Sequence, residues 1–287
     1  MIIETHDLSR SFGKFLAVNQ VNLQVHQGDV YGFLGRNGAG KTTVIRMLMG
    51  IIQSSKGTIS LFDQTTKKIS AQQKQKIGYV PQEQNFYPWM TAKQLAKFVG
   101  ALYSAWDQTE FLRLLDIFDV ALDRKIADLS GGTQVKLALA VALSHHSELL
   151  LLDEPTAGLD PIARREFLDI ISVYAKDKTV FFSSHLVHEI EEVANKIGII
   201  NNGRLCFQGD RKILTESVRQ LTLSEPIAHL SEQLDERIKI IREDKTVITL
   251  KAEAQVWNDF STDLGELNSL SLEEIFILLA TGMECEA

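Results

Sequence analysis

The chain has 287 residues, enough for one large or two ordinary domains, and its mixture of apolar and charged residues is typical of a soluble globular protein. Its formal net charge of −7 argues against a broad basic surface of the kind that binds nucleic acid. We therefore expect no nucleic-acid partner. Its two cysteines, Cys206 and Cys285, are too few and too far apart to indicate a disulfide scaffold or a thiolate metal cluster.

The sequence also predicts where the chain is located. Its most apolar stretches, 137–143 and 149–152, fall well short of the ~18 residues that a membrane span needs. Residues 1–7 lack the basic and then apolar pattern of a secretory signal. We expect a cytoplasmic chain, so that any membrane process it serves would need another, membrane-spanning chain.

The first predicted elements are two strands and a helix. Residues 21–25 alternate between apolar and polar, which is typical of a half-buried strand. Residues 30–34 form a short apolar run, as a buried parallel strand does. The run 42–49 has the apolar spacing of a helix, which Gly50 would end. Strand, glycine-rich loop and helix thus follow one another around Gly35.

The pattern in the middle of the chain predicts further alternation of strands and helices. Thr91 and Gln94 have the spacing of a capping box, and the helical pattern that they open extends to about residue 122. Two more short apolar runs, 149–152 and 179–182, have a helical stretch between them. This alternation predicts an α/β fold with a mainly parallel sheet.

The pattern changes near residue 215. The alternating segments 237–242 and 246–251 flank polar residues as the two strands of a hairpin do. A last helix would begin with a capping box of Ser271 and Glu274 and end at Gly282. We predict a small α+β accessory domain here.

A glycine-rich loop carries the first chemical signal. Its spacing is that of the P-loop, G-x-x-x-x-G-K-[ST], in which backbone N–H groups converge on phosphates, the lysine adds a positive charge and the hydroxyl can ligate Mg²⁺. The helix that follows directs its positive dipole end at the same anion. The loop comprises Gly35, Arg36, Asn37, Gly38, Ala39, Gly40, Lys41, Thr42 and Thr43. A guanine-reading Asn-Lys-x-Asp motif is not formed, since its nearest match, 195–198, ends in glycine.

Two further motifs suit phosphate chemistry. Asp153 and Glu154 follow the buried run 149–152, an arrangement in which the first carboxylate holds Mg²⁺ and the second activates water. The run Ser130-Gly131-Gly132 stands directly before a helical stretch, 135–145, and predicts a second helix start able to bind an anion. One chain therefore has two candidate phosphate sites.

These motifs together resemble the ATP-binding cassette (ABC) family, whose signature Leu-Ser-Gly-Gly-Gln stands just ahead of the second acidic motif, as 129–133 does here. The resemblance covers roughly the first three quarters of the chain. It implies a P-loop NTPase fold with an N-terminal antiparallel β subdomain and a helical subdomain at about 84–145, within an ATP-binding domain at 1–214 that precedes the accessory domain at 215–287. Thr133 departs from the family's glutamine, which puts transmission to partners in doubt more than nucleotide contact.

The resemblance also implies a role for each motif residue. Phe12 would stack on adenine, Gln82 would sense the γ-phosphate, Asp160 would lie between subunits, and His185 would stabilise the γ-phosphate. ATP and Mg²⁺ are the implied cofactors, with Thr42, Gln82 and Asp153 as the magnesium ligands. The implied catalytic residues are Glu154, His185, Gln82 and Lys41. The implied nucleotide-binding residues are Phe12, residues 35–43, Ser130, Gly131, Gly132 and Asp160.

Two kinds of partner follow from the resemblance. The signature of one subunit would complete the P-loop site of a second ABC subunit, giving a homo- or heterodimer. A transmembrane permease subunit would bind near Phe86, Tyr87, Pro88 and Trp89, and would hold the chain at the inner face of the cell membrane, although these aromatic residues would equally suit packing inside the helical subdomain. Residues 272–282 resemble the end of ABC-2-type exporter subunits and favour export, although a simple capped amphipathic helix would look the same.

Two other functions compete with transport. A soluble cassette that acts in DNA repair would carry a long coiled-coil insertion, and one that acts in translation would usually carry two cassettes, and neither is seen here. A regulatory subunit with little activity conflicts with the retained Lys41, Asp153, Glu154 and His185. We therefore expect an active ATPase subunit of a transporter.

Overall fold

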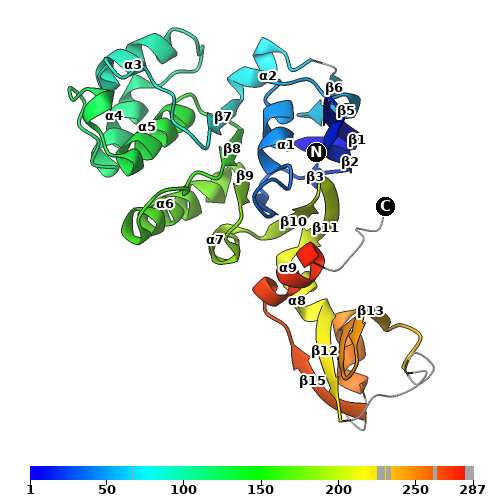
Figure 1. Cartoon of the computed structure of the whole chain (residues 1–287). Coiled ribbons are helices and arrows are strands. Elements are labelled where there is room, and N and C mark those ends of the chain that lie inside the picture. The colour runs from blue at the N-terminus through cyan, green and yellow to red at the C-terminus, as the bar shows by residue number, and fades with distance from the viewer. Residues whose placement is uncertain (67, 225–229, 231–233, 261–263, 282–287) are drawn as a thin grey trace.

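The computed structural model describes residues 1–66, 68–224, 230, 234–260 and 264–281, and the strands of this part form three sheets (Figure 1). The central sheet has the order β11-β10-β4-β9-β8-β7, and its neighbours are parallel except β10 and β11. Its strands are β4 (Val30–Leu34), β7 (Ile77–Val80), β8 (Leu149–Asp153), β9 (Thr179–Ser184), β10 (Lys196–Asn201) and β11 (Arg204–Asp210). The predicted parallel α/β core is confirmed.

The N-terminal sheet is antiparallel. It consists of β1 (Ile3–Phe12), β2 (Phe15–Val21), β3 (Gln24–Val25), β5 (Lys56–Leu61) and β6 (Gln64–Thr66). The apolar residues of the predicted strand 21–25 are all buried, but the strand itself is interrupted between β2 and β3. The reason is a side chain: the Thr5 hydroxyl donates to the Val21 carbonyl and accepts from the Leu23 N–H, where the ladder would otherwise continue.

The central sheet is buried on both faces, and β8 shows how. Leu149 and Leu151 face a core that includes α1 (Lys41–Leu48). Leu150 and Leu152 face the opposite core, which the helices of the middle and C-terminal parts of the chain cover. Successive residues of a strand point to opposite faces, so a strand between two helical layers is apolar at every position.

Three helices form a lobe at one end of the central sheet (Figure 1). They are α3 (Ala92–Gly100), α4 (Gln108–Ile117) and α5 (Gly131–Leu143), and the short α2 (Ala71–Gln75) precedes them. The Thr91–Gln94 capping box is present, but the predicted helix over 91–122 is wrong as a single element. The chain turns after Gly100, where the Trp106 ring packs so closely that a Cβ would lie 2.8 Å from it. Asp107 then caps α4 by accepting from the Glu110 N–H.

The remaining helices lie beside the sheet or connect it to the C-terminal part. They are α6 (Pro161–Tyr174), α7 (Val187–Val193), α8 (Arg211–Ser217) and α9 (Leu272–Thr281), with 3₁₀ turns at Ile126–Asp128, Ala175–Asp177 and Ala254–Asp259. No helix within the described ranges is long and apolar enough to cross a membrane.

The C-terminal part forms a third sheet, which extends away from the other two (Figure 1). It has the antiparallel order β13-β14-β12-β15, from β12 (Val218–Leu223), β13 (Lys239–Asp244), β14 (Val247–Lys251) and β15 (Gly265–Ser269), and it has its own apolar core. The predicted hairpin is β13 and β14. The Ser271–Glu274 box begins α9, whereas Gly282 lies outside the described residues. The boundary predicted at 214/215 falls inside α8, and the division into domains stays a prediction.

A buried histidine at the end of α5 gives a pH-dependent stability. The His145 ring is buried, with Nε2 placed 3.2 Å from the Ile77 carbonyl and the Tyr103 ring packed edge-on against it. Burial first, and then the charges of His146 and Lys178, lower the pKa of His145 to about 4. Between pH 6.5 and 4 the unfolded chain therefore binds the extra proton, so the free energy of unfolding must fall as the pH falls through this window.

We expect this histidine to contribute a loss of about 2 kcal/mol between pH 7 and 4.5, after allowance for solvent screening. Urea unfolding at the two pH values measures it. His145→Gln keeps a donor for the Ile77 carbonyl but does not titrate, so its pH-dependent loss should be smaller by that amount. His188→Gln, at an exposed histidine of α7, should behave as the wild type does. An unchanged pH dependence in His145→Gln contradicts the prediction.

Candidate functional site

The P-loop connects the end of β4 to the start of α1. Residues 36–38 are exposed, while Lys41 begins the helix and is buried. Gly40 has a φ of 111°, and a Cβ at this position would lie 2.8 Å from the Ala17 carbonyl oxygen. Only glycine suits both conditions. The loop therefore presents backbone amides and the N-terminus of α1 on one surface, which is the arrangement that attracts phosphate.

Lys41 is held by oxygen atoms on three sides. Its side chain is only 3% exposed. The ammonium donates to the Gly35 carbonyl at 2.6 Å and to the Arg36 carbonyl at 3.1 Å, and it lies 3.0 Å from Oε1 of Glu154. A cation in this position is already surrounded by negatively polarised oxygens, so phosphate oxygens can exchange with them at little cost in desolvation.

Asp153, the last residue of β8, gathers hydroxyl groups from its neighbours. Thr42, in the first turn of α1, donates to Oδ1 at 3.0 Å, and Ser183, near the end of β9, donates to the same atom at 3.1 Å. Burial raises the pKa of Asp153, an effect that these two hydroxyl groups oppose. The Ser183 contact was not predicted from the sequence. The sequence feature that could have indicated this contact is a hydroxyl residue at the end of a buried strand.

Glu154 joins Lys41 to His185. Oε2 of Glu154 lies 2.9 Å from Nδ1 of His185, and its backbone N–H donates to the Ser183 hydroxyl at 3.0 Å. Glu154 has a φ of 44°, which is uncommon for a residue with a side chain and often marks a functional position. Burial by itself would raise the pKa of Glu154, but Lys41 and then His185 outweigh it and hold the pKa below its usual range.

Ser130, Gly131 and Gly132 lie in the helical lobe, away from this cluster. Ser130 caps α5, which begins at Gly131, four residues earlier than the helical pattern predicted. Thr133 donates its N–H to the Ser130 hydroxyl at 3.2 Å, and the two hydroxyl oxygens are 2.8 Å apart. Thr133, which replaces the family's glutamine, therefore contacts Ser130 directly. Among the described residues, no hydrogen bond or ion pair links 130–132 to the P-loop.

The other predicted site residues are dispersed. Phe12 ends β1 and is 47% exposed, and the Arg10 guanidinium lies 4.7 Å from its ring centre. Gln82 is exposed in the loop after β7. Asp160 caps α6 by accepting from two backbone N–H groups. Within one chain, the structure brings together Lys41, Thr42, Asp153, Glu154 and His185, and it does not bring Phe12, Gln82 or Asp160 into hydrogen-bond contact with them.

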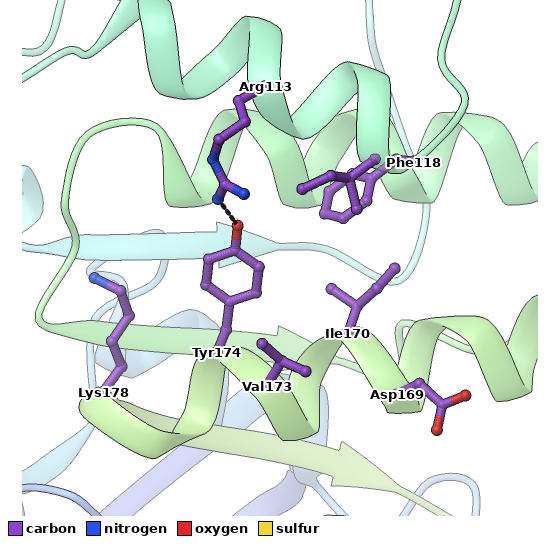
Figure 2. A pocket seen from close by; sticks show the side chains of 8 residues that line it. Arg113, Phe118, Asp169, Ile170, Val173, Tyr174 and Lys178 are labelled. Carbon is purple, nitrogen blue, oxygen red and sulfur yellow. Dashed lines mark hydrogen bonds between the residues drawn. The ribbon is translucent and has the colours of Figure 1, made fainter.

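Two further features lie outside this cluster. Asn195, in the near match to the guanine motif, accepts from the Val30 N–H, and Lys196 pairs with Asp210, so both side chains hold strands together. A cavity of about 520 Å³ lies between α4 and α6, where the Tyr174 hydroxyl meets Arg113 (Figure 2). None of the residues that line it is among the predicted site residues.

Known proteins are similar to this chain in sequence and in fold. Residues 18–157 match a family model described as ABC transporter. The bacitracin transport ATP-binding protein BcrA of Bacillus licheniformis is 39% identical over 71% of this chain and 68% of its own length. The linearmycin resistance ATP-binding protein LnrL of Bacillus subtilis is 31% identical over 97% of this chain and 98% of its own. A dimeric structure of the cassette MJ0796 superposes with a TM-score of 0.66 at 21% identity, over 73% and 98% of the two chains.

The family predicted from the P-loop, the acidic pair and the signature is therefore confirmed, as is the cassette fold. The residues that match the family model include the P-loop, Asp153 and Glu154. Because the chain matches relatives at more than 30% identity over most of their length, it belongs to the ABC transporter family, as an ATP-binding and ATP-hydrolysing subunit.

Proposed function

We propose that the chain pairs with a second cassette subunit, encloses ATP between the two, and drives a separate membrane-spanning permease at the cytoplasmic face of the membrane. The observation that supports this most directly is that the two candidate anion sites of one chain lie apart, with no hydrogen bond or ion pair between them among the described residues. Lys41, Glu154 and His185 form one, and the start of α5 forms the other. No side chain crowds Gly131, since a Cβ there would meet nothing within 4 Å. A partner's phosphate can therefore reach this helix start.

In this proposal each motif residue has one task. Lys41 and the amides of 35–40 bind the β- and γ-phosphates, and Ser130, Gly131 and Gly132 of the other subunit bind the γ-phosphate from the opposite side. Glu154 accepts a proton from the attacking water, while His185 and Gln82 contact the γ-phosphate. Phe12 stacks on adenine with the ring face that Arg10 leaves open, and Asp160 lies at the subunit interface.

The residues present also fit a magnesium ion. Thr42 and Asp153 place a hydroxyl and a carboxylate oxygen 3.0 Å apart beside the P-loop. Mg²⁺ in nucleotide sites takes one or two carboxylates, with phosphate oxygens and water, and hydroxyl or amide oxygens can share the remaining positions. When bound, the ion would neutralise charge on the β- and γ-phosphates. We propose Thr42, Asp153 and Gln82 as its protein contacts.

An exposed aromatic cluster supports a membrane partner. Tyr87 and Trp89 have ring centres 5.1 Å apart, and the ring centre of Phe98 of α3 lies 6.0 Å from that of Tyr87. All three residues are exposed. A cavity of about 360 Å³ between α1 and α5 lies beside Phe86, which itself packs against the lobe's core. Exposed aromatic groups next to a hollow are typical of an interface. We propose that a cytoplasmic helix of the permease binds here.

We also propose export as the direction of transport. BcrA is named for bacitracin transport and LnrL for linearmycin resistance, and the second of these matches this chain through its C-terminal part. Resistance to an antibiotic is most simply achieved by removing it from the cell. A function in DNA repair or translation remains the alternative that a membrane-binding experiment distinguishes.

Trp89→Glu tests the partner surface. Trp89 is 65% exposed, so we expect the variant to fold, to keep its own ATP hydrolysis within about twofold, and to lose at least about tenfold in binding to permease-containing membranes. Co-sedimentation with membranes that contain the co-expressed permease measures this. Leu112→Glu, at another exposed apolar residue of the same lobe, is the matched control. Equal membrane binding by both variants contradicts the assignment of this surface.

A further inference from the structure

A buried carboxylate on α7 has no part in the site described so far. Glu189 is fully buried and lies four residues after His185. Burying an acidic group is costly unless donors surround it. Its surroundings therefore show what the side chain does.

The first partner of Glu189 holds the loop that carries His185. The Ser184 hydroxyl donates to Oε2 of Glu189 at 2.6 Å. The same hydroxyl oxygen accepts the Leu186 N–H at 3.0 Å, so that it closes a turn around His185. Glu189 thus fixes the residues on both sides of the histidine.

The other partners hold the loop that carries Glu154. The Thr156 hydroxyl donates to Oε1 of Glu189 at 2.7 Å, two residues after Glu154. Nε of Arg164, on α6, lies 3.2 Å from the same oxygen. One carboxylate therefore contacts the loop after β8, the last residue of β9 and the helix that Asp160 caps.

We propose that Glu189 is a positioning residue that sets the geometry between Glu154 and His185 during ATP hydrolysis. Those two side chains meet at 2.9 Å although they come from different strands. The carboxylate suits this task because it has only acceptor atoms, which accept from two hydroxyl groups, while its charge pairs with a guanidinium. This inference rests on the proposed roles of Glu154 and His185.

Glu189→Gln tests the inference, because it keeps the shape but replaces one acceptor with a donor. We expect kcat to fall about tenfold to a hundredfold, since small displacements of reacting groups have effects of this size, while KM and ATP affinity stay within about twofold. Steady-state phosphate release by the full chain with ATP and Mg²⁺ gives both constants. Glu192→Gln is the matched control: Glu192 also lies on α7 and pairs with Arg165 of α6 at 2.8 Å, but touches neither catalytic loop.

Two smaller changes keep the test decisive if Glu189→Gln folds poorly. Ser184→Ala and Thr156→Val each remove one hydroxyl, and each should lower kcat severalfold without raising KM. The inference is overturned if these variants and Glu189→Gln retain the kcat of the Glu192→Gln control. It is also overturned if their losses appear in ATP affinity alone. Normal turnover by Glu154→Gln would instead refute the roles on which the inference rests, whatever Glu189→Gln does.

Discussion

Glu154→Gln should lower the rate of ATP hydrolysis by about 10²- to 10⁴-fold, which is the usual contribution of a general base. The glutamine keeps the shape and can still contact Lys41 and His185, but it cannot accept a proton from water. In the chain without nucleotide, Lys41 holds the pKa of Glu154 low. Phosphate would draw this ammonium away, so the pKa of Glu154 should rise when ATP binds, and the carboxylate should become a stronger base where it is needed.

ATP binding should survive the same change, because the P-loop amides and Lys41 remain. Phosphate release and equilibrium binding of ATP separate the two effects, and sedimentation should show the variant as a dimer that persists in ATP. Glu148→Gln, at an exposed glutamate paired with Lys76, is the control and should hydrolyse ATP at the wild-type rate. Turnover by Glu154→Gln within about tenfold of that rate would assign the base to another residue.

The parts of this site that the sequence predicted are those in which neighbours along the chain are also neighbours in space. The apolar run of β4, the glycine spacing and the helical pattern of α1 lie within 20 residues of one another, so local rules were sufficient to place Lys41 and Thr42. The single helix predicted over 91–122 was wrong for a reason that also lies in neighbouring residues. The apolar spacing continues across the turn at 101–107, and only Gly100 and the capping Asp107 indicate the break.

The contacts between distant segments could not be predicted in this way. Ser183 meets Asp153, and His185 meets Glu154, because β9 pairs with β8 in the central sheet. Strand order depends on how layers pack, not on the sequence of one strand. The family resemblance supplied His185 as a site residue, but not its partner. Glu189 was missed because an acidic residue on a helix is usually exposed.

The C-terminal part shows the same limit. The alternation at 237–251 predicted a hairpin, which is present. It could not predict that α9 returns to the ATP-binding part, where Leu272, Ile275 and Phe276 join the core that also contains Val187 and Ile190 of α7. The helix that follows His185, α7, is thus packed against α9. Because β15 of the C-terminal sheet is followed directly by α9, this packing joins the C-terminal sheet to the helix after His185.

Mixing two inactive variants should restore ATP hydrolysis, if the signature of one copy completes the P-loop site of another. Lys41→Ala removes the ammonium that binds phosphate. Ser130→Asp places a negative charge where the partner's phosphate would lie, and aspartate is as good a helix cap as serine, so α5 should stay folded. Each variant alone should lose at least about 99% of its activity, because both sites of its dimer carry the defect. In a mixed dimer, one site combines an intact Lys41 with an intact Ser130.

An equimolar mixture should therefore recover about a quarter of the wild-type rate, because half of the random pairs are mixed and each has one intact site of two. The control is a mixture of Lys41→Ala with Glu154→Gln. Lys41 and Glu154 lie 3.0 Å apart in the same chain, so every site in this mixture keeps one defect and no activity should return. Recovery in both mixtures would mean that two subunits can supply Lys41 and Glu154 to the same site. Recovery in neither mixture would mean that Ser130 does not complete a catalytic site between copies of this chain. Recovery in the first mixture alone is the result expected for a site shared by two subunits.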